Sequence, residues 1–180
     1  MKDVIILFLD IDGVLCTSRS HYAFGDKGGL KLAWDVTCCQ MIRRLCMDYK
    51  CKLVISSVWR KPNRFSVFRQ YLCTYGLIDH TYSSLFKDPW YREFVPGDWM
   101  TPVVSKCQTH RERGTEIREW LKKHPKVKHY LIIDDSNDMF RYQMPYLVLT
   151  DCDEGFGALD FEKCEKFLRK WRREKCTKKL

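Results

Sequence analysis

The sequence lacks an apolar run that approaches the roughly 18 residues of a membrane-spanning helix. The apolar start of the chain is interrupted by Asp10 and Asp12 and has no small-residue cleavage site, so we do not interpret it as a signal peptide. Nine glycines and six prolines are too few for a collagen-like or linker-dominated chain. What remains is a globular composition, 45% hydrophobic and 31% charged, and the length of 180 residues predicts one domain over 1–180.

The cysteines lack the spacing of a metal site. There are ten of them, but no CxxC pair and no combination of Cys and His at zinc-finger spacing. Without a secretory signal, cysteines of this kind are typically reduced thiols that serve as small apolar residues. We therefore expect an intracellular protein in a reducing compartment, the cytoplasm or the nucleus, with no membrane partner.

Positive charge exceeds negative charge, and the excess is unevenly placed. The net charge is +9, and residues 163–180 hold nine Lys or Arg against two Glu, so this tail carries +7. Such a tail either binds the phosphates of a nucleic acid or forms the solvated face of a helix, and both interpretations stay open.

Apolar runs and helical periodicity alternate along the chain. Continuous apolar runs at 4–9, 52–55, 130–133 and 146–149 are typical of strands buried on both faces. Apolar spacing predicts helices over about 35–50, from Pro62 to Gly76, from Thr115 to before Pro125, and over about 156–175. Within residues 77–112, we expect one short strand and long ordered loops. This order predicts an α/β fold, with a parallel central sheet and helices on both faces.

Polar side chains follow three of the predicted strands. They are Asp10 and Asp12, with Gly13 next, after the first, Ser56 and Ser57 after the second, and Asp134 and Asp135 after the third, with Asp138 one turn later. Because ligands bind outside the carboxyl ends of the strands in open α/β sheets, we expect these groups to act together. A single Asp after a strand is typically a turn or a helix cap, but four carboxylates from two strand ends favour a Mg²⁺ site.

The same residues carry a resemblance to a known family. The segments LFLDIDGVL, VISS and LIIDD look like motifs I, II and IV of the haloacid dehalogenase (HAD) superfamily of phosphohydrolases. The segments SSVWR, TP at 101–102, RGTEIREWL at 113–121 and YLIIDDSND at 130–138 are similar to a narrower group. That group is the single-domain HAD modules of Swiss Army Knife RNA repair proteins. The resemblance covers roughly residues 3–150 and implies a HAD-like Rossmannoid core.

The resemblance implies a role for each matched residue. Asp10 would be the nucleophile, and Asp12 would be the general acid for the leaving oxygen and later the base for water. Ser56 would donate a hydrogen bond to the transferring phosphoryl group, and Gly13 and Ser57 would contribute to substrate binding. The Mg²⁺ ligands would be the Asp10 carboxylate, the Asp12 carbonyl and Asp134, with Asp135 acting mostly through metal-bound water.

The cationic motif departs from the superfamily pattern, which usually has a lysine. Here Arg113 opens the matching segment, and a guanidinium also binds phosphate well; Lys106 and Arg111 remain alternatives. Arg60 either contacts a distal phosphate of the substrate or is a surface residue at a helix start.

Aromatic residues in the central region also allow two interpretations. Trp90, Tyr91 and Trp99 either stack on the bases of single-stranded nucleic acid or pack over the core, and we adopt the second.

The spacing of the motifs leaves little room for a cap domain. The 35 residues of 16–50 and the 52 residues of 61–112 must also supply core elements, so we expect a loop or flap but no large cap. An open site favours a phosphorylated end of RNA or DNA, or a nucleotide, as substrate. The alternatives are a protein or small-metabolite phosphatase and a non-catalytic module that binds nucleic acid.

Overall fold

A computed structural model of the chain describes residues 4–24, 34–60, 71–77, 99–104 and 112–177, with side chains described up to residue 172. Its centre is a sheet of four parallel strands: β1 (Ile5–Leu9), β2 (Cys51–Ile55), β3 (His129–Asp134) and β4 (Leu147–Leu149). The strand order is β2-β1-β3-β4, so β1 lies between β2 and β3. Because the chain passes from one side of β1 to the other, the crevice outside the ends of β1 and β3 is the topological switch point of the sheet.

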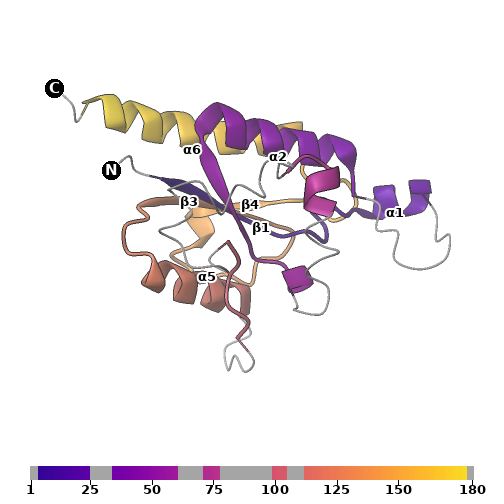
Figure 1. Ribbon diagram of the computed structural model, residues 1–180, viewed down its shortest axis with the longest axis horizontal. Coiled ribbons are helices and arrows are strands. Elements are labelled where there is room, and N and C mark those ends of the chain that lie inside the picture. The colour runs from indigo at the N-terminus through magenta and orange to yellow at the C-terminus, as the bar shows by residue number, and fades with distance from the viewer. Residues whose placement is uncertain (1–3, 25–33, 61–70, 78–98, 105–111, 178–180) are drawn as a thin grey trace.

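Helices cover both faces of this sheet, as the sequence predicted. Figure 1 shows α2 (Val36–Tyr49) and α6 (Ala158–Thr177) on one face and α5 (Glu112–Lys123) on the other. All five residues of β1 are buried, because alternate side chains point to opposite layers. Leu7 lies in the hydrophobic cluster of α2 and α6, whereas Phe8 packs edge-on against Trp120 of α5.

The helix α2 is capped at both ends. The side chain of Asp35 accepts hydrogen bonds from the backbone N–H groups of Thr37 and Cys38, and Lys50 ends the helix in a left-handed conformation. β2 begins at the next residue, so helix and strand are joined by a single turn.

A short helix, α1 (Ser18–Phe24), lies where the sequence predicted only a loop or flap. Thr17 and Ser20 cap its start reciprocally: the N–H of Ser20 donates to Thr17 Oγ1 at 2.9 Å, and the N–H of Thr17 donates to Ser20 Oγ at 3.0 Å. Capping groups rather than apolar spacing therefore define the start of this helix. For this reason, the apolar periodicity of the sequence does not indicate it.

Several further expectations fall partly on described residues. The helix predicted from Pro62 is described only from Tyr71, and the short strand predicted within 77–112 is described only as an isolated parallel bridge between Ile55 and Met100. Trp99 packs against the hydrophobic core, as we expected, while Trp90 and Tyr91 lie outside the described residues. No large cap domain accompanies the sheet in the described part of the chain.

Two further predictions are that the cysteines are reduced thiols and that no helix spans a membrane. The eight cysteines whose side chains are described are all free. None of the described helices has the length and apolar character needed to cross a membrane.

Candidate active site

Asp10 lies at the end of the central strand and is nearly buried, with 5% of its surface exposed. Its backbone N–H donates to the carbonyl of Ile133 at 3.0 Å, so the hydrogen-bond ladder between β1 and β3 continues one residue beyond β1. The Oδ1 atom accepts from the N–H of Ile11 at 2.7 Å. The backbone therefore fixes the position of this carboxylate at the switch point.

Asp134 and Asp135 reach the same point from the end of β3. One carboxylate oxygen from each of Asp10, Asp134 and Asp135 lies within 4.8 Å of the others. Burial raises the pKa of Asp134 well above its usual range, and the charge of Asp10 raises it further. Burial and Asp10 raise the pKa of Asp135 as well. The carboxylates therefore lie close together at a place where burial already disfavours their ionised forms. Ionising all of them there costs free energy unless a cation binds between them.

This carboxylate cluster fits a hard divalent cation. The Oδ1 atom of Asp134 accepts from the N–H of Ser136 at 3.0 Å, but its buried Oδ2 atom accepts no hydrogen bond from the described residues. A buried carboxylate oxygen without a hydrogen-bond donor is available to a metal ion, and an all-oxygen ligand set is typical of Mg²⁺.

Gly13 allows the two acidic segments to approach closely. Its φ of +66° favours glycine, and a Cβ atom built there would lie 2.1 Å from the Oδ2 atom of Asp135. The hydroxyl of Thr150 donates to the carbonyl of Gly13 at 2.9 Å and ties the loop to the residue after β4. Any side chain at position 13 would displace Asp135 from the carboxylate cluster.

Asp12 follows Asp10 by two residues but is more exposed. Its Oδ2 atom accepts a hydrogen bond from the indole Nε1 of Trp59 at 2.8 Å. Desolvation raises the pKa of Asp12, the hydrogen bond from Trp59 lowers it, and the net direction is upward. A carboxyl group with a raised pKa at the edge of the site is suited to exchanging a proton with a substrate.

Ser56 and Ser57 follow β2, and both are fully buried. The N–H of Ser56 donates to the carbonyl of Leu9 at 2.9 Å, which places Ser56 beside the end of β1. Its hydroxyl has no hydrogen-bond partner among the described residues, so its donor is unused in this structure. Ser57 instead supports the local turn, because its hydroxyl accepts from the N–H of Trp59 and its carbonyl accepts from Arg60.

Arg113 supplies the positive charge of the site from the first turn of α5. Its Nη2 atom donates to Asp10 Oδ2 at 3.0 Å, and its Nε atom lies 3.0 Å from Asp134 Oδ2 without directing its hydrogen at that oxygen. Burial lowers the pKa of Arg113, but the surrounding carboxylates more than offset this and hold the pKa above its usual value. The alternatives Lys106 and Arg111 lie outside the described residues.

Arg60 is buried rather than at the surface, with 7% of its surface exposed. Its guanidinium forms an ion pair with Glu116 and also contacts the carbonyls of Ser57 and Pro102. The structure therefore places Arg60 behind Arg113, bound to protein groups, and its contact with a distal phosphate stays a prediction.

Sequence reasoning missed two residues of this site, Trp59 and Glu116. Both lie inside the segments SSVWR and RGTEIREWL, which carried the family resemblance. Their partners are far away in the chain: Trp59 is 47 residues from Asp12. The available signals were their place within those segments and, for Glu116, its spacing three residues after Arg113.

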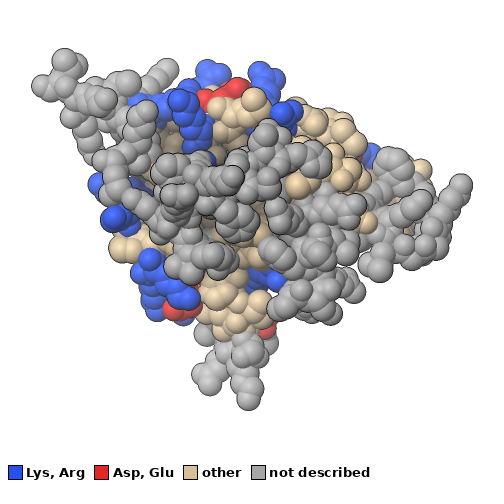
Figure 2. Space-filling view, in the orientation of Figure 1, with Lys and Arg blue, Asp and Glu red and all other residues tan. Residues whose placement is uncertain are grey.

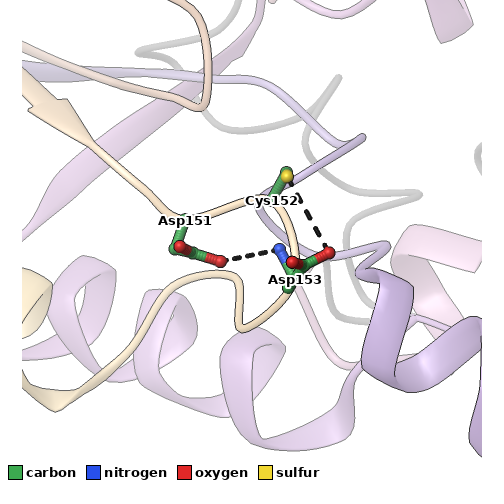
Figure 3. A group of neighbouring side chains, drawn as sticks. All are labelled: Asp151, Cys152 and Asp153. Atoms are coloured by element: carbon green, nitrogen blue, oxygen red, sulfur yellow. Dashed lines mark hydrogen bonds between the residues drawn. The ribbon is translucent and has the colours of Figure 1, made fainter.

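A second acidic group, Asp151, Cys152 and Asp153, follows β4 and is exposed. Figure 3 shows that Asp151 faces the backbone N–H of Asp153, to which its Oδ1 atom is hydrogen-bonded at 2.8 Å. The same oxygen accepts from the N–H of Glu154 at 3.1 Å. These contacts explain the group as a turn that closes the loop between β4 and α6.

Residues 6–161 match the model of a family described as the HAD domain in Swiss Army Knife RNA repair proteins. This match spans most of the chain, from β1 into α6, and includes every strand end described above. The chain belongs to this family. Searches of curated proteins and of solved structures found no match.

Membership in this HAD family confirms the resemblance inferred from the sequence, and the parallel sheet with helices on both faces confirms the expected α/β fold. It also supports phosphohydrolase chemistry of the HAD type as the general activity. Of the residues that the sequence proposed for that chemistry, the fold brings Asp10, Asp134, Asp135 and Arg113 close together, whereas Arg60 is paired with Glu116.

Proposed function

We propose that this HAD domain is a Mg²⁺-dependent phosphohydrolase that works through an aspartyl-phosphate on Asp10. One observation carries the proposal: the Asp10 carboxylate belongs to a carboxylate cluster, in which Asp134 is also buried, and is at the same time paired with Arg113 at 3.0 Å. A nucleophile held between a cation site and a guanidinium is placed where a phosphoryl group can be neutralised on two sides.

In this proposal, Mg²⁺ is held by the carboxylates of Asp10 and Asp134, by the carbonyl of Asp12, and through water by Asp135. When bound, it neutralises negative charge on the phosphoryl oxygens and on the cluster itself. The Oδ2 atom of Asp134, which accepts no hydrogen bond from the described residues, supports this assignment. The chemistry described next is that of the chain's own residues.

An Asp10 oxygen attacks phosphorus and the bond from phosphorus to the ester oxygen breaks, while Asp12 gives its proton to that leaving oxygen. Asp12, now ionised, takes a proton from water as the water attacks the aspartyl-phosphate. This second step releases inorganic phosphate and restores the Asp10 carboxylate. Trp59 holds the Asp12 carboxyl group at the edge of the site.

The remaining residues bind the phosphoryl group. The free hydroxyl of Ser56 donates to a phosphoryl oxygen, and Arg113 neutralises developing charge beside Asp10. Gly13 and Ser57 shape the backbone around the site. A contact of Arg60 with a distal phosphate requires its guanidinium to leave Glu116.

We propose a phosphorylated end of RNA or DNA, or a nucleotide, as the substrate, in an intracellular reducing compartment. The family's description as a domain of RNA repair proteins and the basic tail support this choice. The free thiols among the described cysteines are consistent with that compartment.

The test is a phosphatase panel with Mg²⁺: an aryl phosphate, nucleotides, phosphopeptides, and oligonucleotides phosphorylated at the 3′ or 5′ end. We expect phosphate release, which chelation by EDTA stops and Asp10→Asn abolishes, because an amide cannot form the acyl phosphate. Asp12→Asn should reduce turnover by about 10²–10⁴-fold. Preferred hydrolysis of a phosphopeptide would redirect the substrate proposal, and binding of oligonucleotides without turnover would indicate a non-catalytic module.

A further inference from the structure

A chain of alternating charges runs from the carboxylate cluster into the protein interior. Asp10 and Asp134 contact Arg113, Arg113 contacts Glu116, and Glu116 contacts Arg60. Glu116 and Arg60 lie outside the carboxylate cluster, and both side chains are almost fully buried. Burying a further carboxylate and a further guanidinium costs free energy of desolvation. The position of Glu116 and Arg60 beside Arg113 therefore requires an explanation.

Glu116 differs from the other two carboxylates around Arg113. In the proposed reaction, Asp10 becomes the acyl phosphate and Asp134 binds the metal ion, so neither carboxylate remains free for Arg113. Glu116 takes part in neither event. Its Oε2 atom lies 3.7 Å from Arg113 Nη1, from a position one turn along the same helix. It is thus the carboxylate that stays with Arg113 throughout the reaction.

Arg60 fixes how Glu116 presents its two oxygens. The Oε1 atom binds the Arg60 guanidinium and accepts from the N–H of Val104 at 3.4 Å. This leaves Oε2 directed at Arg113. The arrangement therefore joins the segment after β2 to the start of α5 through one carboxylate.

We propose that Glu116 is a positioning residue, which holds the Arg113 guanidinium in place for the phosphoryl group while Arg60 holds Glu116. The proposal rests on the proposed function and assigns to that site a residue that acts through Arg113. A long arginine side chain loses binding strength when it is free to reorient, and misplacement of a catalytic group by about 1 Å can cost about 10²-fold in rate.

The decisive variant is Glu116→Gln, which keeps the shape of the side chain and removes its charge. Glu119→Gln is the matched control, because Glu119 lies on the same helix and pairs with Lys122 at the surface. With Mg²⁺ and an aryl phosphate, Glu116→Gln should lower kcat/KM by about 10- to 100-fold, while Glu119→Gln should match the wild type. The rise in melting temperature on adding Mg²⁺ should persist in both variants, since the carboxylate cluster is intact.

A double variant separates positioning from structural support. Glu116→Gln leaves Arg60 buried without its carboxylate, and Glu116→Gln with Arg60→Met removes that imbalance. We expect the double variant to recover melting temperature but not kcat. Recovery of kcat together with stability would overturn the proposal, as would a single Glu116→Gln variant with wild-type kcat and KM.

Binding of inorganic phosphate to the Mg²⁺-loaded protein, measured by calorimetry, tests Glu116 independently of turnover. We expect Glu116→Gln to weaken this binding by at least about tenfold, because Arg113 is less well held. Wild-type protein that binds phosphate but hydrolyses no ester would overturn the proposed function alone. Wild-type protein that does neither would overturn both, and equal binding by wild type and Glu116→Gln would overturn the role of Glu116.

Discussion

At the scale of single residues, Asp134 has the environment least like that of an ordinary aspartate. Its side chain is fully buried, it lies beside the Asp10 carboxylate, and one of its oxygens accepts no hydrogen bond from the described residues. Arg113 offsets part of this cost, but the net effect is a raised pKa. The native fold without a cation therefore favours the protonated form of Asp134, whereas a bound cation favours the ionised form.

The pH dependence of stability follows from this shift. The folded state retains the Asp134 proton over a range in which the unfolded chain, with its ordinary pKa of 3.8, has released it. The contribution of Asp134 to the free energy of unfolding is complete below the pKa of the unfolded chain. It is lost as the pH rises through the raised pKa of the folded state. We expect the metal-free protein to melt at a lower temperature at about pH 8 than at about pH 5. The melting temperature should fall by about 2–4 °C for each kcal/mol by which the free energy of unfolding decreases.

The variant Asp134→Asn tests this expectation, because an amide does not ionise. In EDTA, it should melt above the wild type near about pH 8 and show a smaller fall between the two pH values. Added Mg²⁺ should raise the melting temperature of the wild type and leave that of the variant almost unchanged. A variant that still gains stability from Mg²⁺ would remove Asp134 from the metal site, and a destabilised metal-free variant would contradict the raised pKa.

At the scale of elements, the start of α5 is fixed by the segment after β3. The N–H of Arg113 donates to Asp138 Oδ2 at 3.1 Å, and the buried Gln143 donates from Nε2 to the carbonyl of Gly114 at 3.0 Å. Gly114 permits this contact: a Cβ atom there would lie 2.7 Å from Gln143 Oε1 and 3.0 Å from the backbone nitrogen of Phe140. Arg113 thus provides the positive charge of the site, and Gly114 allows the close packing that positions Arg113.

Gly114→Ala provides a test with a definite sign. Helix propensity alone predicts stabilisation by about 0.5–1 kcal/mol, because alanine favours a helix over glycine. The close backbone contacts predict the opposite, since overpacking costs about 1–3 kcal/mol. We expect the packing term to prevail, so the free energy of unfolding in urea should fall and turnover should fall with it. A variant more stable than the wild type would show that α5 can shift without strain.

The elements that the sequence predicted well are those specified by local patterns. β1 and β3 are continuous apolar runs with acidic residues at their ends, and α2 has both apolar spacing and an Asp35 cap. Helix α1 was missed because Thr17 and Ser20 define it without an apolar stripe. The partners of Asp12 and Arg60 depend on contacts between distant segments, so no local pattern predicts Trp59 or Glu116.

At the scale of the whole molecule, basic residues lie on the surface of the helical layers. Figure 2 shows Lys and Arg over the layer of α2 and α6 and around α5. The ring of Trp171 on α6 stacks on His129, the first residue of β3, with centroids 4.9 Å apart. The active site lies at the other ends of these strands. The end of α6 beyond Arg172 is therefore at the amino edge of the sheet, about 20–30 Å along the helix from Ala158 at its usual rise per residue.

This placement makes the contribution of the tail depend on substrate length. About 20–30 Å corresponds to roughly six to nine nucleotides at a rise of 3.4 Å for each nucleotide of a DNA strand. A phosphorylated mononucleotide at Asp10 does not reach the tail, whereas a longer oligonucleotide can contact both. Under the proposed function, we expect the basic tail to raise affinity for long substrates only and not to accelerate the chemical step, because such remote contacts act equally on substrate and transition state.

Truncation after Arg172 tests this length dependence and removes four Lys or Arg and one Glu. The cut keeps Trp171 and the bond from Arg172 to the carbonyl of Asp48, so the packing of α6 on α2 is preserved. At low salt, KM should rise roughly tenfold for long phosphorylated oligonucleotides, with little change in kcat or in mononucleotide hydrolysis. The slope of log KM against log salt should also become shallower, by up to about two for three net charges. Equal KM values for both enzymes on long oligonucleotides would leave the tail as a solvated helix face, whereas an equal loss on mononucleotides would mean that the cut disturbs the fold.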